Sequence, residues 1–178
     1  MEKKGLIIVH TGDGKGKTTA ALGMAMRAWG NHLRVLILQF IKGSWKYGEL
    51  EAIKALASVH NHIEIRQGGL GFSQRDRGAE EEHRRAAAEL LQMAVDELRN
   101  NAWDMVILDE FNYAYSFGFI APKDLDSLLS ARSENTHLVF TGRNASHELI
   151  DHADLVTEMR LIKHPFQKGI KAQRGVEF

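Results

Sequence analysis

One stretch of nine residues, Thr11–Thr19, restricts most strongly what this chain can fold into. Its sequence is TGDGKGKTT, with the apolar run 6–9 before it and AALGMA after it. That order predicts a buried strand, a glycine-rich loop and a helix, which is the arrangement of a phosphate-binding loop. Glycines let backbone N–H groups approach phosphate oxygens, and the start of the helix adds positive potential.

Individual residues of this loop have predicted roles. We expect Lys17 to contact a phosphate as a point charge and the Thr18 hydroxyl to bind a Mg²⁺ ion held by the phosphates. The strict pattern has Gly where this chain has Thr11, and the chain places Gly12 and Gly14 inside the loop instead. The alternative is a plain glycine turn, which would not require GKTT at the start of a helix.

The length of 178 residues and the composition limit the number of domains, the partners and the location that can be expected. Without a linker or a repeat, residues 1–178 are expected to form a single domain, and the tail 161–178 either folds over the site or stays mobile. A net charge of zero argues against a nucleic-acid partner. The chain has no cysteine, no apolar run that could span a membrane and no signal-peptide pattern. We therefore expect a cytoplasmic protein without a membrane partner.

Strand and helix patterns alternate along the rest of the chain. Continuous apolar runs, typical of parallel strands covered on both faces, and amphipathic stripes follow one another. Strands are predicted near residues 34–40, 63–66, 104–109, 137–141 and 155–161, and helices near 49–57, 80–100 and 122–131. This alternation predicts an α/β fold with a doubly wound, mostly parallel sheet of about five or six strands.

Two strand ends carry charged candidates. The apolar strand before Asp109 and Glu110 predicts that at least one of these acids serves the metal side of the phosphate loop; the alternative is a structural cap for the next segment. Arg143 follows the strand 137–141. It either contacts a phosphate tail or lies at the surface of a turn.

Two aromatic segments and the histidines are less specific. Phe72, in the glycine-rich segment 67–74, either packs on the core or covers a flat apolar ligand. The aromatic-rich segment 112–120 is interpreted as core, a dimer surface or a pocket wall. Nine histidines are scattered without metal-ligand spacing. The residues alone thus predict a magnesium–nucleotide site and a second substrate, which leaves a kinase, an NTPase or a transferase that attacks elsewhere on ATP.

Six motifs along residues 5–178, in the same order and at compatible spacing, resemble the P-loop corrinoid adenosyltransferases, which act on cob(I)alamin or cob(I)yrinic acid a,c-diamide. The motifs lie at 11–21, 39–43, 71–72, 108–110, 141–143 and 171–175. The resemblance implies a P-loop NTPase-type, RecA-like fold, a homodimer and a reductase that supplies electrons to cobalt. It also implies transfer of the 5′-deoxyadenosyl group of ATP to the Co(I) of a reduced corrinoid, with release of triphosphate. The ribose 5′ carbon, rather than the γ-phosphate, would face the acceptor.

The resemblance also implies residue roles. Lys17, Thr18 and Glu110 would be catalytic, and Thr18, Glu110 and Asp109 would hold Mg²⁺ or Mn²⁺. Corrinoid contacts would come from Phe72 and from position 74, where Gln74 stands in place of the Trp of better-known members. The implied nucleotide-binding residues are Gly12, Asp13, Gly14, Lys15, Gly16, Lys17, Thr18, Thr19, Arg27, Gln39, Phe40 and Arg143. The alternatives that stay open are a P-loop NTPase or small kinase with another acceptor, and a nucleotide-dependent corrinoid carrier.

Overall fold

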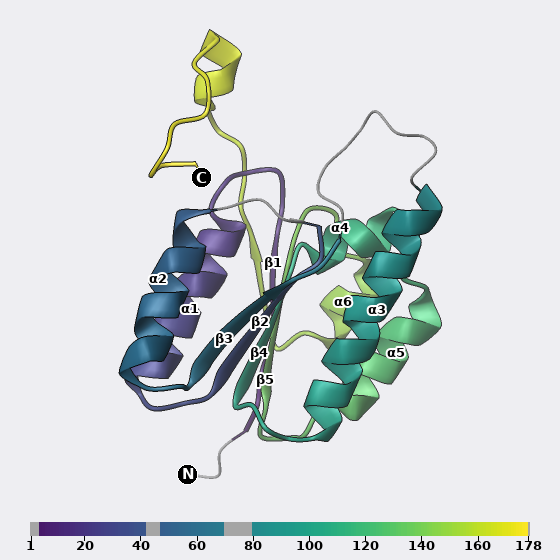
Figure 1. The fold of residues 1–178 in the computed structure, drawn as a ribbon. Helices are drawn as coiled ribbons and strands as arrows, with labels where there is room; N and C mark the ends of the chain where they lie inside the picture. Colours follow the sequence, from purple (N-terminus) through teal and green to yellow (C-terminus); the bar gives the residue numbers. More distant parts are fainter. Residues whose placement is uncertain (1–3, 42–46, 70–79, 178) are drawn as a thin grey trace.

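The computed structural model describes residues 4–41, 47–69 and 80–177. Its centre is a six-stranded parallel sheet in the order β3-β2-β4-β5-β1-β6 (Figure 1). The strands are β1 (Ile7–Thr11), β2 (Val35–Gln39), β3 (Ile63–Gln67), β4 (Met105–Asp109), β5 (His137–Thr141) and β6 (Leu155–Glu158). The predicted α/β fold with a parallel sheet of five or six strands is confirmed.

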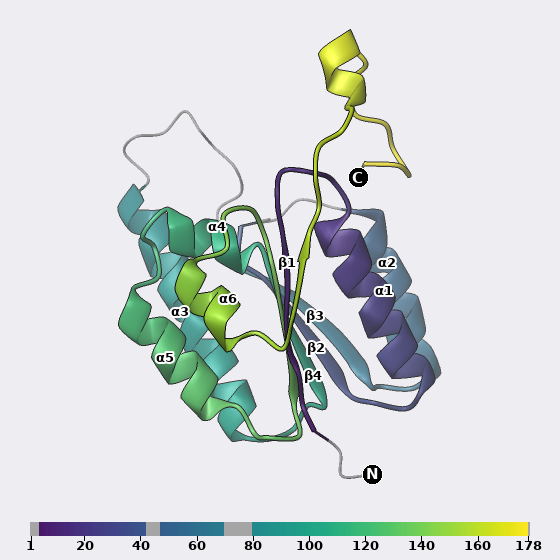
Figure 2. The ribbon, with the colours of Figure 1, turned by 180° about the vertical axis from the view of Figure 1, so that it is seen from behind.

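Helices cover both faces of the sheet. In Figures 1 and 2, α1 and α2 lie on one side and α3 to α6 on the other, so the sheet is doubly wound. The helices are α1 (Lys17–Gly30), α2 (Gly48–Val59), α3 (Glu80–Arg99), α4 (Phe111–Ser116), α5 (Pro122–Ala131) and α6 (His147–His152), followed by the 3-10 helix η1 (Pro165–Lys168). No helix within the described ranges is long and apolar enough to cross a membrane.

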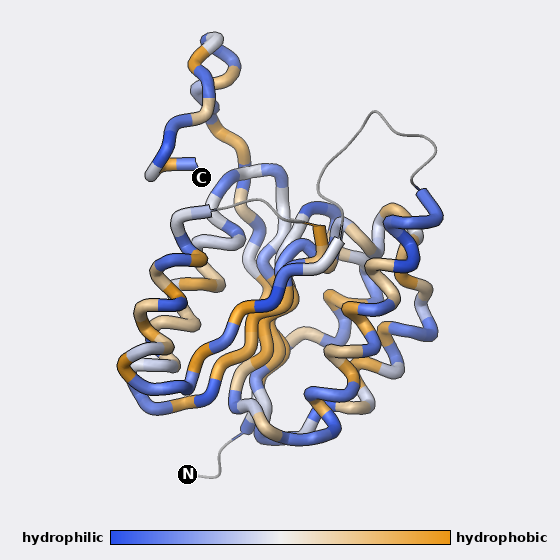
Figure 3. Tube along the Cα trace, viewed as in Figure 1, coloured by the Kyte–Doolittle hydropathy of each residue, from blue (hydrophilic) through white to orange (hydrophobic). Residues whose placement is uncertain are grey.

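The central strands are apolar on both faces because helices cover both (Figure 3). Successive residues alternate between two cores. Ile37 and Ile107 pack in the core beneath α1 and α2, whereas Leu36 and Leu108 pack in the core beneath α3 to α5. The predicted apolar stripe of α3 is also confirmed, and its buried residues are Ala87, Leu90, Leu91, Ala94, Val95 and Leu98.

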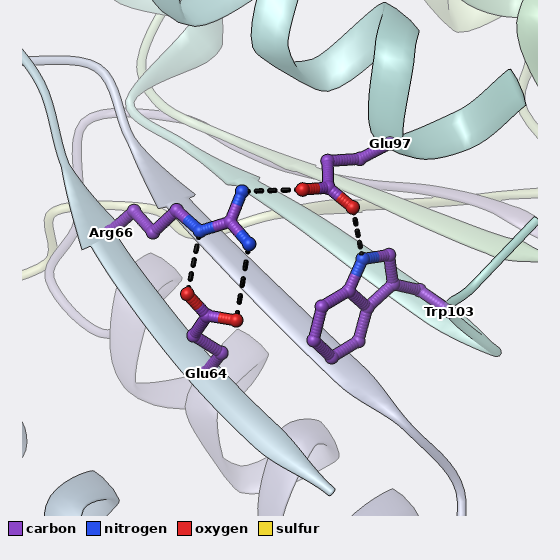
Figure 4. Close-up of polar contacts among 4 residues, drawn as sticks. All are labelled: Glu64, Arg66, Glu97 and Trp103. Atoms are coloured by element: carbon purple, nitrogen blue, oxygen red, sulfur yellow. Dashed lines mark hydrogen bonds and ion pairs between the residues drawn. The ribbon is translucent and has the colours of Figure 1, made fainter. Parts of the chain in front are cut away.

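The outer strand β3 carries a polar network at its surface. The Arg66 guanidinium donates to both carboxylate oxygens of Glu64, at 2.6 and 3.1 Å, and to Glu97 of α3 at 2.5 Å (Figure 4). The indole N–H of Trp103 donates to the other Glu97 oxygen at 2.7 Å. We call these four residues the Arg66 network. It joins the edge of the sheet to the last turns of α3.

The opposite outer strand leads into the tail. β6 ends at Glu158, earlier than the predicted strand 155–161, and the backbone of the next residue, Met159, bonds to Thr11 and Gly14 of the phosphate loop. Its N–H donates to Thr11 O at 2.8 Å and its C=O accepts from Gly14 N at 2.6 Å. Figures 1 and 2 show the tail extending from the body and turning back beyond η1. Near its end, Glu177 forms an ion pair with Lys15 of the loop at 2.7 Å.

Candidate functional site

The candidate site lies at the carboxyl edge of the sheet, where the loop after β1 turns into α1. Gly12 and Gly16 have positive φ angles of 93° and 107°, and Gly16 caps α1. A Cβ atom at Gly12 would lie 2.5 Å from the Met159 carbonyl oxygen, and one at Gly14 would lie 2.7 Å from it. The chain that packs against the loop therefore requires glycine at positions 12 and 14.

Lys17 begins α1 with a nearly buried side chain, 8% exposed. Its ammonium donates to the carbonyl oxygens of Gly12 at 2.6 Å and Gly14 at 2.7 Å, so it holds the loop closed around itself. Burial lowers the pKa of Lys17 below its ordinary value, while the nearby carboxylates of Glu110 and Asp13 act in the opposite direction. An anionic ligand beside this ammonium would favour its charged form.

Asp109, at the end of β4, is the centre of a buried polar network and is 1% exposed. Its Oδ1 accepts from the Thr18 hydroxyl at 2.8 Å and from the Thr141 hydroxyl at 2.7 Å. Its Oδ2 accepts from the Gln39 amide at 3.0 Å, and Gln39 in turn accepts from Gln67 at 3.2 Å. We call these residues the Asp109 network. It joins α1 to the carboxyl ends of β2, β3, β4 and β5.

Glu110 follows Asp109 but has a different environment. It adopts a left-handed backbone, φ 61°, at the start of α4, and its N–H donates to the Thr141 hydroxyl at 2.9 Å. The negative charge of Glu110 acts to raise the pKa of Lys17, so the two side chains lie within electrostatic reach of each other. The Thr18 hydroxyl thus meets Asp109, while Glu110 lies half-buried toward the loop cation. The metal role of each acid stays a prediction.

The donor set suits a magnesium ion brought by a nucleotide. Mg²⁺ prefers oxygen ligands and is usually held by one or two carboxylates together with substrate phosphates and water. Thr18 and Asp109 supply a hydroxyl and a carboxylate in hydrogen-bond contact, with Glu110 adjacent. Throughout the part of the chain that the structure describes, no three His, Cys, Asp or Glu side chains form a metal-binding group. A protein-only cage is thus not what these residues offer.

The remaining charged candidates differ in how close they lie to the loop. Arg143 approaches Asp13 with Nε 3.8 Å from Oδ1, and both side chains are largely exposed. Lys15 is paired with the tail. Arg27 lies ten positions beyond Lys17 and is exposed, about 15 Å further along α1. Arg143 and Asp13 therefore share the loop region, whereas Arg27 does not.

The side chains of Gln39 and Phe40, both weaker nucleotide candidates, are directed inward. Gln39 is 3% exposed and bound to Asp109. Phe40 is 2% exposed and packs edge-on against Phe111 in the core, with ring centroids 5.5 Å apart. Their contacts with a nucleotide stay a prediction. Thr19 is exposed on α1, and Phe72 and Gln74 lie outside the described residues.

Sequence reasoning did not assign a role to Thr141 or Gln67. Thr141 is fully buried and contacts Asp109 and the Glu110 backbone. In the sequence, Thr141 stands out as a polar residue that ends a buried strand, at the same edge of the sheet as Asp109. Gln67 ends β3 in the same way. Polar residues at the carboxyl ends of parallel strands are therefore the pattern that would have found both.

Comparisons with known proteins agree with one another. Residues 3–178 match the family model described as ATP:corrinoid adenosyltransferase BtuR/CobO/CobP. A corrinoid adenosyltransferase from Sinorhizobium sp. is 42% identical over 179 residues, covering 99% of this chain and 82% of the relative. One from Escherichia coli (strain K12) is 37% identical over 178 residues, covering 100% of this chain and 88% of the relative.

A solved structure supports the fold alone. The crystal structure of the flagellar accessory protein FlaH from Methanocaldococcus jannaschii superposes with a TM-score of 0.59 at 10% sequence identity. The match covers 88% of this chain and 71% of the FlaH chain.

Proposed function

The chain belongs to the ATP:corrinoid adenosyltransferase family, and we propose that it transfers the 5′-deoxyadenosyl group of ATP to the Co(I) of a reduced corrinoid. The observation that carries the proposal is the meeting of the glycine loop, Lys17 and the Asp109 network at one sheet edge. This edge can bind a triphosphate and stabilise it as a leaving group.

The reaction balances without a protein nucleophile. The electron pair of Co(I) forms the bond to the ribose 5′ carbon, and the electrons of the breaking C–O bond leave with the triphosphate. The protein has to hold the cobalt in line with that carbon and stabilise the negative charge that develops on the leaving group. When the triphosphate binds, Lys17 exchanges its hydrogen bonds to the Gly12 and Gly14 carbonyls for bonds to phosphate oxygens. The loop N–H groups bind the same anion.

Magnesium would be held by Thr18 together with Asp109, Glu110 or both. When bound, it would supply positive charge that neutralises the triphosphate oxygens. The hydrogen bonds from Gln39 and Thr141 to Asp109 orient this carboxylate toward Thr18 and limit its motion. Mn²⁺ has the same preference for oxygen ligands.

An anaerobic assay tests this function. Protein, magnesium-ATP and chemically reduced cobalamin are mixed, the Co(I) absorbance is followed, and the phosphate product is identified. We expect Co(I) to be consumed together with formation of triphosphate and a light-sensitive cobalt–carbon product. Persistent Co(I) with ADP or phosphate would indicate a kinase or NTPase, and tight corrinoid binding without turnover would indicate a carrier.

We also propose that the protein is a homodimer. The outer strand β6 leaves Leu155 and Val156 at 45% and 41% exposure, and in the tail Ile162 and Phe166 reach 89% and 77%. Exposed apolar side chains clustered on one segment are typical of interaction surfaces. Sedimentation velocity is expected to give twice the 20.0 kDa chain mass; a monomer at micromolar concentration would contradict the proposal.

We further propose a cytoplasmic location and a reductase as electron source. Co(I) has to be generated and kept reduced, and a chain without cysteine is compatible with a reducing compartment. An assay started from Co(II) cobalamin should therefore require an added reductant or flavoprotein. Turnover from Co(II) without any electron donor would contradict the reductase proposal.

A further inference from the structure

Beside the phosphate loop, α4 and its following turn carry a stack of aromatic rings that the proposed chemistry has not used. Tyr113 and Phe117 are stacked with ring centroids 4.2 Å apart and planes 23° apart. Phe119 lies 6.1 Å from Phe117, and His83 of α3 is stacked on Phe119 at 5.8 Å and 9°. We call these four side chains the aromatic shelf. They belong to two helices and one turn, so the fold rather than a local repeat assembles them.

Phe117 is the exposed member of the shelf, whereas Tyr113, Phe119 and His83 are half-buried. Phe117 is 55% exposed, the only large aromatic side chain besides Phe166 among the exposed apolar residues of the described chain. Phe111, at the start of α4, is fully buried in the core. An exposed ring that is stacked on a second ring has lost conformational freedom without being removed from water, and such surfaces are typical of ligand sites.

Contacts on both sides fix the shelf relative to the candidate site. The Asn112 amide donates to Gly142 O at 3.0 Å, directly before Arg143. A Cβ atom at Gly142 would lie 3.0 Å from the Asn112 Cβ, so α4 packs closely on the loop that carries Arg143. On the far side, the Arg84 guanidinium donates to Gly118 O. The shelf therefore cannot shift without disturbing the loop that bears Arg143.

The shelf also begins next to the predicted reaction centre. Tyr113 lies three residues after Glu110, about one helical turn. Burial raises the pKa of the Tyr113 hydroxyl, and the negative charge of Glu110 raises it further, so the two side chains lie within electrostatic reach. Figure 1 shows α4 at the same end of the sheet as the loop after β1. A ligand on the shelf would thus border the triphosphate site.

We propose that the aromatic shelf is a subsite for the corrin macrocycle, with Phe117 as its main contact. The inference rests on the proposed function, because it assigns a place to the second substrate of that reaction. The cobalt has to reach the ribose 5′ carbon, so the macrocycle must lie beside the triphosphate site, and the shelf extends from there. A flat, conjugated and largely apolar ring system is the ligand that stacked aromatic side chains bind well. This assigns the aromatic segment 112–120 to a pocket wall in its exposed part and to the core in its buried part.

Equilibrium dialysis and kinetics with Phe117→Ala test the shelf. The variant is expected to raise both the Kd for Co(II) cobalamin, measured with magnesium-ATP present, and the KM for Co(I) cobalamin by about tenfold. The KM for ATP should stay unchanged. Phe117→Tyr keeps the ring and should restore corrinoid affinity, and Val59→Ala is a matched control, because Val59 is 72% exposed on α2. Melting temperatures of the three variants verify that they fold.

The outcomes separate the shelf from the reaction. If the wild-type protein adenosylates cobalamin and Phe117→Ala has unchanged corrinoid affinity, the shelf proposal is wrong and the proposed function stands. If wild-type protein binds Co(II) cobalamin through Phe117 without forming the cobalt–carbon product, the shelf is supported and the reaction is wrong. A rise in the ATP KM that matches the corrinoid effect would overturn the shelf as a specific subsite, because the change would then act on the whole site.

Discussion

The Asp109 network and the Arg66 network are both built around one charged side chain with several partners, yet they differ in burial and place. Asp109 is 1% exposed and accepts hydrogen bonds from the hydroxyls of Thr18 and Thr141 and the amide of Gln39 at the carboxyl edge of the sheet. The Arg66 side chain is 29% exposed and pairs with two carboxylates at the β3 edge. The first is a carboxylate placed in the interior and hydrogen-bonded to Thr18, Thr141 and Gln39; the second is a guanidinium paired with carboxylates near water.

This difference indicates different tasks. Burying a carboxylate is costly unless it is hydrogen-bonded or paired, and the hydrogen bonds to Asp109 hold it at the edge of the sheet that carries the phosphate loop. An ion-paired cluster at the surface satisfies its own charges and stabilises the fold modestly. The comparison therefore predicts that changes around Asp109 and the adjoining loop reduce activity, whereas changes around Arg66 reduce stability and leave activity intact.

The largest expected effect is that of Lys17→Ala in the phosphate loop. Loss of a charge contact to the leaving triphosphate should lower kcat by about 10²- to 10³-fold. The measurement is the rate of triphosphate formation under saturating ATP. Lys54→Ala, at a 69% exposed lysine of α2, is the matched control and should retain the wild-type rate. Unchanged turnover of Lys17→Ala would remove the loop from the mechanism.

The next largest effect is expected from Asp109→Asn. The substitution removes the charge and keeps the shape. It should weaken the affinity for magnesium by about 10- to 100-fold, the range seen when metal ligands or their supporting groups are altered. Magnesium titrations of Asp109→Asn and Glu110→Gln distinguish the two acids. A shifted titration for only one variant assigns the metal role to that residue, and unshifted titrations for both would contradict the predicted metal site.

A smaller effect is expected from Arg66→Met, and it should appear in stability alone. The substitution removes hydrogen bonds to Glu64 and Glu97 and leaves Glu97 with the Trp103 bond. We expect the free energy of unfolding to fall by about 2 kcal/mol, as measured by urea denaturation, with kcat and both KM values unchanged. A tenfold loss of activity would show that the two networks are not separate in function.

The smallest effect concerns the acid limb of stability. Burial tends to raise the pKa of Glu97, but the hydrogen bonds from Trp103 and Arg66 outweigh it and hold this pKa below its ordinary value of 4.5. Because the pKa of Glu97 is lower in the folded state, its ionised carboxylate stabilises the protein at pH values above the unfolded-state pKa. This stabilisation is lost as the pH falls through the folded-state pKa. The wild type should therefore lose more stability than Glu97→Gln on acidification below about pH 4.5. Parallel pH dependence of the two melting temperatures would contradict this.

Much of the fold and part of the site followed from local patterns. A glycine loop between an apolar strand and a helix, followed by further apolar runs and amphipathic stripes, predicts parallel strands covered on both faces. The acid pair at 109–110 was predicted from the end of its strand, and the structure brings Asp109 against Thr18. These predictions depend on residues close in sequence, where periodicity and chain direction suffice.

Only the tertiary structure decided which side chains meet. That Asp109 contacts Thr18 depends on the register of β4 beside β5 and on how α1 packs against the sheet. The need for Gly12 and Gly14 arises from Met159, which lies about 145 residues away and packs against the loop. The place of Phe117 in the aromatic shelf was equally undetermined. Contacts between distant segments depend on how strands pair and how helices pack, and composition or local periodicity does not encode these arrangements residue by residue.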